Sequence, residues 1–304
     1  MKLKNKITLV ISCLIIFLVG LVSYYYKDEF YAFYLKNFYK DEKVVLKHNE
    51  YYKARDYKYI KNTNDFVAKD EDHLKDIFYT IINSGVDSFS FECDKEYKAC
   101  LTDVRKLASN QALLSNINNF VSPFNSFEQL VINYSDKGLV TIGVIKNYSE
   151  EEIVSLNDKV DQVISEVITD DMDDRDKIKA IHDYIINNSN YAESDMNNNS
   201  YNKATGNLLN GLGLCGGYAD SMALFLDRFG INNYKIASET HIWNLVELDN
   251  KWYHLDLTWD DPVISDGSHR LDRLFFLITD QRLKELEVDK HEYDPNIYLE
   301  LKGA

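Results

Sequence analysis

The sequence predicts an α+β protein in which one membrane-spanning helix precedes two folded domains. Three observations support this: an uncharged apolar run near the N-terminus, mixed helical and strand-like patterns between residues 65 and 170, and a cysteine at a helix start followed by a β-hairpin. With 304 residues and 45% hydrophobic content, the chain is long enough to bury a sizeable core. We therefore expect a folded protein with more than one domain.

The charge and the motif content exclude several classes of function. A formal net charge of −15 argues against nucleic acid as a partner, because binding phosphates depends on clustered lysine and arginine side chains. The sequence has no HExxH-type run, and its acidic segment at 170–176 lacks the glycine and the ligand spacing of a calcium loop. We therefore expect neither a metal nor a cofactor.

Residues 1–26 have the pattern of a membrane anchor. Three lysines precede an uncharged run from residue 7 to residue 23, and three tyrosines close that run. At about 1.5 Å per residue, a helix through the last tyrosine spans roughly 30 Å, the thickness of a hydrocarbon core. Lysines before the run place the N-terminus in the cytoplasm, so we expect everything after it to face outward.

Two alternatives remain open for this segment. It is a cleaved secretory signal if a protease accepts the Tyr-Tyr-Tyr-Lys sequence at 24–27, where small residues are usual. It is a lipoprotein signal if residues 10–13 act as a lipobox, although most of the apolar run follows Cys13. All three interpretations export the rest of the chain. Cys93 and Cys100 suit an oxidising compartment, but the sequence leaves open whether they form a disulfide.

The composition divides the exported part into three segments. Residues 27–62 are rich in tyrosine, phenylalanine and lysine and are predicted to form a juxtamembrane stalk. Residues 63–170 are predicted to form a small α+β domain of unknown role, and an acidic stretch then marks the boundary to a second domain at 171–304. A helix near the start of this domain carries His182 among spaced isoleucines, so we interpret that histidine as a packing residue.

Cys215 stands at the start of a predicted helix and has glycines on both sides. The positive end of the helix dipole and the free backbone N–H groups favour a thiolate at this position. The glycines allow other backbone, or a substrate, to approach closely. A cysteine beside an apolar helix is usually a small core residue, however, so its interpretation depends on the residues that follow.

A β-hairpin is predicted next, with strands at 241–248 and 251–259 and a two-residue turn between them. That register places Trp243 opposite Asp256 and His241 opposite Thr258. Since side chains alternate between faces, His241 and Asp256 share one face and lie diagonally across from each other. A thiolate, a histidine base and an orienting carboxylate are the parts of an activated nucleophile.

Other residues are candidates for parts of the site. His254 lies on the same face of the hairpin and is the main rival for the base, and Asp260 or Asp261 replaces Asp256 if the register slips. We expect a substrate to contact Gly216, Tyr218 and Trp243, although packing of the hairpin explains Trp243 equally well. Packing is the better explanation for Trp252 and Trp259.

Three motifs resemble the core of bacterial transglutaminase-like proteins. In chain order they are NLLNGLGLCGGYA at 207–219, HIWN at 241–244 and KWYHLDLTWDDP at 251–262. With FFLITD at 275–280, the resemblance covers about residues 174–290. It implies a papain-like α+β fold in which the nucleophile's helix packs against an antiparallel sheet that bears the histidine and the aspartate. It implies nothing certain about residues 27–170.

The resemblance also implies a mechanism and a location. Cys215 attacks a carboxamide or peptide carbonyl, His241 accepts and returns the proton, and Asp256 fixes the imidazole tautomer. Attack on the resulting thioester by an amine gives crosslinking, and attack by water gives proteolysis or deamidation. The Cys215 N–H is one candidate oxyanion donor, and Asn210 is a candidate for the second. We expect a protein or cell-wall peptide substrate at the outer face of a bacterial membrane; the alternative is a non-catalytic binding or assembly module.

Overall fold

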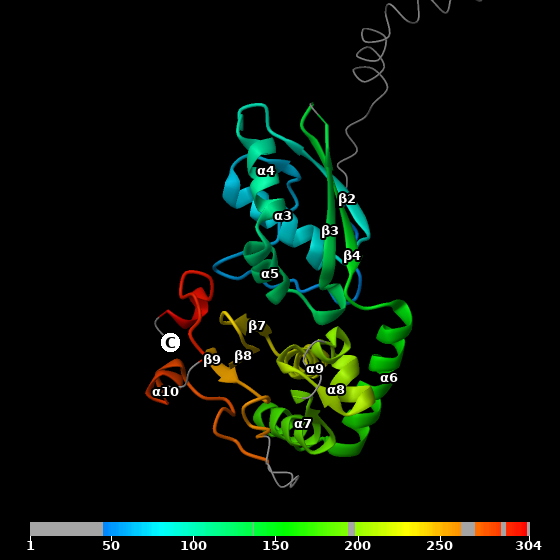
Figure 1. The fold of residues 1–304 in the computed structure, drawn as a ribbon, viewed down its shortest axis with the longest axis vertical. Coiled ribbons are helices and arrows are strands. Elements are labelled where there is room, and N and C mark those ends of the chain that lie inside the picture. The colour runs from blue at the N-terminus through cyan, green and yellow to red at the C-terminus, as the bar shows by residue number, and fades with distance from the viewer. Residues whose placement is uncertain (1–44, 136, 194–197, 263–270, 287–289, 303–304) are drawn as a thin grey trace, which may run out of the picture. The chain divides into compact units, whose positions relative to one another are not determined.

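A computed structural model describes residues 45–302, apart from 136, 194–197, 263–270 and 287–289 (Figure 1). The predicted anchor at 1–26 lies outside the described residues. Within the part that is described, no helix is both long enough and apolar enough to cross a bilayer. Residues 46–304 form one compact unit, and its mixture of helices and sheets agrees with the predicted α+β class.

The first half of this unit is a four-stranded sheet covered on one face by helices (Figure 1). The strands lie in the order β1-β2-β4-β3, with bounds β1 Val67–Ala68, β2 Ser88–Cys93, β3 Phe127–Tyr134 and β4 Leu139–Lys146. The helices are α3 Glu71–Asn83, α4 Cys100–Ser109 and α5 Gln111–Asn119. Along β4, Val140, Ile142 and Val144 are buried while Leu139 and Ile145 are exposed, which is the period-two pattern of a half-buried sheet.

A disulfide joins Cys93, at the end of β2, to Cys100, at the start of α4. The question that the sequence left open is thereby answered in favour of a bond. This bond ties the sheet to the helical layer over a separation of seven residues.

The predicted stalk is wrong from residue 46 onward, because this part of the chain belongs to the folded unit. Tyr57 and Ile60 are buried, and the Tyr57 ring packs against Phe120 and Tyr234. The side-chain amide of Asn83 also donates a hydrogen bond of 2.8 Å to the Lys53 carbonyl. The aromatic composition that suggested an interfacial stalk therefore supplies core side chains instead.

A helical layer follows, formed by α6 Glu150–Val167, α7 Asp174–Asn188, α8 Ala204–Asn210 and α9 Cys215–Arg228. Helix α6 begins with a capping box, in which Ser149 and Glu152 bond each other's backbone N–H groups. Leu156 and Val160 of α6 share a hydrophobic core with Ile181 of α7 and Phe225 of α9. The predicted boundary near residue 170 thus falls within one core.

The C-terminal sheet is antiparallel and consists of β7 Asn233–Ala237, β8 Ile242–Leu248 and β9 Lys251–Leu255. Asp249 and Asn250 form its two-residue turn with φ of 52° and 60°, the positive values that a type I′ hairpin requires. Leu248 pairs with Lys251, which confirms the predicted register.

The prediction that the second strand continues to residue 259 is wrong, because β9 ends at Leu255. Asp256 accepts the backbone N–H groups of Thr258 and Trp259 on its Oδ1, at 3.0 and 3.2 Å, and the chain turns away. Trp243 and His241 therefore do not form ladder pairs with Asp256 and Thr258. The short strands β5 Asn190–Tyr191 and β6 Leu212–Gly213 and the helix α10 Asp280–Glu285 complete the surroundings of the sheet.

Candidate active site

Cys215 is the first residue of α9, and the side chain of the N-cap residue, Leu214, makes no capping hydrogen bond. Cys215 and Gly216 are half-buried, whereas the helix is buried from Gly217 to Leu226. The thiol therefore stands where an otherwise buried helix reaches the surface. The uncapped N–H groups and the helix dipole favour a negative charge at this position, as for a thiolate or an oxyanion.

The glycines after Cys215 allow the preceding segment to pack closely against the helix. A Cβ on Gly217 would lie 2.5 Å from the carbonyl oxygen of Tyr201. The N–H of Leu214 donates to the same carbonyl at 2.7 Å, so this segment is bound to the start of α9. The segment that contains Tyr201 therefore supports the nucleophile's helix.

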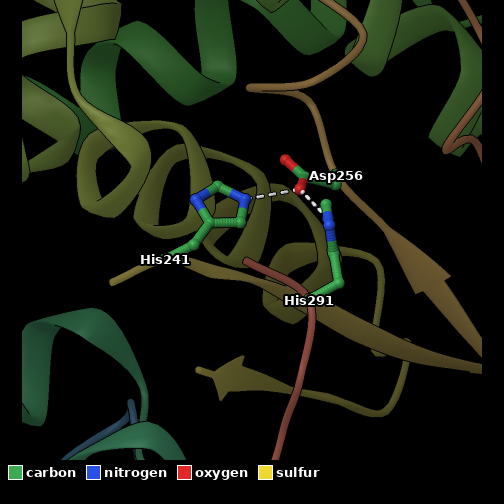
Figure 2. Close-up of side chains that lie close together, drawn as sticks. All are labelled: His241, Asp256 and His291. Carbon is green, nitrogen blue, oxygen red and sulfur yellow. Dashed lines mark hydrogen bonds and ion pairs between the residues drawn. The ribbon is translucent and has the colours of Figure 1, made fainter. Parts of the chain in front are cut away.

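His241 and Asp256 form a close buried pair. The Nε2 of His241 lies 2.5 Å from Oδ2 of Asp256, and both side chains are almost fully buried (Figure 2). Burial alone would raise the pKa of Asp256, but the charge and the hydrogen bond of His241, together with a hydrogen bond from His291, lower it to about 2. Asp256 is therefore a carboxylate at any physiological pH.

The same pair determines the protonation of His241. Burial acts to lower the pKa of this imidazole, but Asp256 and then the Cys215 thiol outweigh it and raise the pKa to about 9. Since Asp256 occupies Nε2, the nitrogen left for the thiol is Nδ1, which points away from the carboxylate in Figure 2. An imidazolium that persists near neutral pH stabilises a thiolate beside it.

His254 lacks the surroundings of a base for Cys215. It is 1% exposed, its Nδ1 accepts the indole N–H of Trp243 at 3.0 Å, and its Nε2 lies 3.6 Å from Asp280. Burial lowers the pKa of His254, which keeps the ring neutral. The geometry thus favours His241 over this rival.

Asp260 and Asp261 anchor the turn after β9. Asp260 lies 3.1 Å from Nε2 of the buried His182 and accepts the N–H of Phe275 at 2.9 Å. Asp261 accepts the hydroxyl of Tyr218. Both carboxylates are therefore engaged in hydrogen bonds that are separate from the His241–Asp256 pair. His182 is buried within the structure, as expected for a packing residue.

Two of the expected substrate contacts are corrected by burial. Trp243 and Tyr218 are each 1% exposed, so neither side chain offers a surface to a substrate. The Trp243 ring stacks on one face of the His241 imidazole, with centroids 5.5 Å apart, and so restricts its rotation. Gly216, which is half-buried beside the thiol, stays a predicted contact. Asn210 is exposed at the end of α8 and stays a candidate for the second oxyanion donor.

Two neighbours of the pair, His291 and Tyr191, were not expected from the sequence, whereas Trp259 packs as expected. His291 bonds Asp256 at 2.8 Å, and the half-buried Trp259 packs edge-on against both histidine rings. Tyr191 lies on β5, which pairs with the strand leading into Cys215; burial, and then the negative charge of Cys215, raise the pKa of Tyr191. His291 stands in a polar segment without periodicity, so no local pattern pointed to it. Tyr191 and Trp259 resemble ordinary aromatic residues of strands, so their types alone did not link them to the site.

His241, Asp256 and His291 also bring together ligand atoms of the kinds that bind metal ions. One ligand atom from each lies within 4.8 Å of the others. The carboxylate oxygen is 2.5 Å from one imidazole nitrogen and 2.8 Å from the other, which are hydrogen-bond lengths. Ligand atoms at about 2.0–2.1 Å from a tetrahedral zinc ion would be roughly 3.3 Å apart. The observed distances are therefore those of hydrogen bonds and are shorter than the spacing of ligands around a tetrahedral zinc ion.

Three comparisons with known proteins place the site in context. Residues 161–257, which include Cys215, His241 and Asp256, match the family model of the transglutaminase-like superfamily. Among solved structures, one described as the crystal structure of a TGase is 16% identical with a TM-score of 0.35. That match covers 48% of this chain and 47% of the other, so the chain spans about half the length of that protein. A comparison with curated proteins found no match.

Proposed function

We propose that the protein is a cysteine acyl-transfer enzyme with Cys215 as its nucleophile, because residues 161–257 match the family model of the transglutaminase-like superfamily. The observation that carries the proposal is the buried His241–Asp256 pair, which keeps the imidazole charged near neutral pH while a free thiol stands half-exposed at the start of α9. His241 is the proposed acid and base, and Asp256 is the group that orients it.

The proposed reaction has two steps. The Cys215 thiolate attacks the carbonyl carbon of a carboxamide or peptide bond, and the N–H of Cys215 donates to the developing oxyanion. The His241 imidazolium gives its proton to the departing amine, which leaves a thioester on the sulfur. Water or a second amine then attacks the thioester, and His241 takes a proton from the attacking group as the thiolate is released. Water gives hydrolysis, and an amine gives transfer.

We also propose that the enzyme acts outside the cytoplasm, on protein or cell-wall peptide substrates. The support is the anchor-like pattern of residues 1–26 and the disulfide between Cys93 and Cys100, since disulfides persist in oxidising compartments. The net charge of −15 disfavours binding to the phosphates of nucleic acid, so nucleic acid is not a proposed partner.

Acyl-enzyme formation tests the catalytic proposal directly. Purified protein incubated with p-nitrophenyl acetate should gain one acetyl group on Cys215, detected by intact-mass and peptide mass spectrometry, because an activated thiolate accepts acyl groups from esters. Cys215→Ala should gain none. Added glycine ethyl ester should capture the acetyl group if the enzyme is a transferase, whereas a hydrolase should release acetate.

Two results would contradict the proposal. One is acetylation spread over lysines to the same extent in the parent and in Cys215→Ala. The other is a folded parent whose Cys215 stays unmodified and that releases p-nitrophenol no faster than Cys215→Ala, which would instead indicate a non-catalytic binding module built on the same fold.

A further inference from the structure

His291 comes from a segment far along the chain from the residues that it contacts. It follows α10 and lies beyond residues 161–257, yet its ring reaches the carboxylate that orients His241. In Figure 2 the rings of His241 and His291 converge on the same oxygen of Asp256, at 2.5 and 2.8 Å. His291 is 6% exposed, so this contact is made in the protein interior.

Aromatic neighbours fix the orientation of the His291 ring. It stacks on Phe275 with centroids 5.0 Å apart and an interplanar angle of 6°. Trp243 and Trp259 contact it edge-on, at 4.8 and 5.0 Å between centroids. With rings on three sides, His291 has little freedom to turn its Nε2 away from Asp256.

The hydrogen-bond partners assign the tautomer of His291. Nε2 faces a carboxylate oxygen and therefore carries the proton, whereas the buried Nδ1 has no hydrogen-bond partner among the described residues. The Nε2–H of His291 is consequently a donor to Asp256.

The contact completes the set of donors around Asp256. Oδ1 accepts the backbone N–H groups of Thr258 and Trp259, and Oδ2 accepts from His241 and His291. Three of these donors lie on or next to the predicted hairpin, and His291 is the one that comes from outside it. If its N–H were lost, Oδ2 would interact with His241 alone.

We propose that His291 is a positioning residue of the active site: its imidazole donates the Nε2–H to Asp256 and so fixes the carboxylate that orients His241. The proposal rests on the proposed function, because it assigns His291 a role through His241 in activating Cys215. His291 does not itself touch the reacting atoms.

The donor also moderates the strength of the His241–Asp256 pair. A carboxylate oxygen shared between two N–H groups attracts each of them less than an oxygen bonded to one. Removing the His291 donor should therefore strengthen the ion pair, raise the pKa of His241, and move the alkaline limb of the pH–rate profile to higher pH. It should also slow turnover, because the carboxylate and the imidazole lose their fixed orientation.

Other titratable groups face this cluster from the packed elements: His254 on β9, Asp280 on α10, Asp260 after β9, Cys215 on α9 and Tyr191 on β5. His254 and Asp280 face each other at 3.6 Å, and Asp260 is bonded to His182. Cys215 acts on His241 itself and is the group whose reactivity is measured. None of these contacts needs to change when the ring of His291 is replaced.

Two variants of the full-length protein separate positioning from packing. His291→Phe keeps a ring for the aromatic contacts but removes the donor, whereas His291→Gln keeps an N–H near the position of Nε2. The measurements are the pH profile of p-nitrophenyl acetate turnover, the rate of Cys215 alkylation and the thermal midpoint. We expect His291→Phe to lower turnover about 10- to 100-fold and to shift the alkaline limb upward by about 0.5–1 pH unit. His291→Gln should stay within about threefold of the parent.

Several results would overturn this proposal. They are a His291→Phe protein with the parent's rate and pH profile, a loss of thermal stability in both variants with no movement of the alkaline limb, and a parent whose turnover depends on zinc removable by EDTA. If the parent forms an acyl-enzyme but the variants behave like it, only the role of His291 fails. If the parent forms none, the proposed function fails first.

Discussion

Asp256→Asn should lower p-nitrophenyl acetate turnover by about 10²–10⁴-fold while the protein remains folded. The carboxylate accepts N–H groups on both oxygens, from two imidazoles and two backbone amides. An asparagine has one acceptor oxygen and would direct N–H groups toward at least one of these donors. It also lacks the charge that raises the pKa of His241 to about 9, so the imidazole would be neutral and free to adopt the wrong tautomer.

Asp260→Asn is the matched control, since it also removes a buried carboxylate that is bonded to a histidine. Asp260 contacts His182 and the N–H of Phe275 rather than His241. The turnover of Asp260→Asn should therefore stay within about tenfold of that of the parent. The substitution should instead lower the thermal stability. Equal losses of turnover in the two variants, both folded by circular dichroism, would indicate that Asp256 acts only through packing.

Gly206→Ala should lower the free energy of unfolding by about 2–4 kcal/mol. A Cβ at this position would lie 2.5 Å from the Leu212 carbonyl oxygen and 3.0 Å from Cα of Tyr201. Both contacts are with backbone, so no side chain can rotate to relieve them. Alanine's helix propensity offsets at most about 1 kcal/mol, and the steric term therefore dominates. Urea denaturation followed by circular dichroism measures the change.

The control for this change is Gly143→Ala in β4, where a Cβ would make ordinary contacts of 3.6 Å with Val131. Its unfolding free energy should stay within about 1 kcal/mol of the parent. A Gly206→Ala protein as stable as Gly143→Ala would contradict the close packing of α8 against the strand that leads to Cys215.

The elements around the nucleophile were predictable because local chemistry determines them. A two-residue Asp-Asn turn between alternating strands sets the hairpin register, and Leu248 pairs with Lys251 as expected. Glycines on both sides of Cys215 marked a close approach of backbone, and Tyr201 provides that approach at Gly217. The meeting of His241 with Asp256 followed from the same register, even though β9 ends before the aspartate.

The remaining features depend on contacts between segments that are distant in sequence. His291 reaches Asp256 across 35 positions, and no periodic pattern marks it. Tyr57 was assigned to a stalk because a segment rich in aromatic residues has the same composition whether it packs in a core or lies at a membrane surface. In the structure Tyr57 is buried. Trp243 has the size of a cleft residue, and only the stacked histidine and its hydrogen bond to His254 show that it is enclosed.

The pH dependence of Cys215 alkylation by iodoacetamide tests the central claim most directly, with the parent, His241→Ala and His254→Gln compared and Cys215→Ala as the background. The predicted result is rapid labelling of the parent near pH 6, at a rate close to that near pH 8, lost in His241→Ala and kept in His254→Gln. Slow labelling near pH 6 in all three proteins, rising only above about pH 8 as for an ordinary thiol, would contradict the claim that His241 activates Cys215.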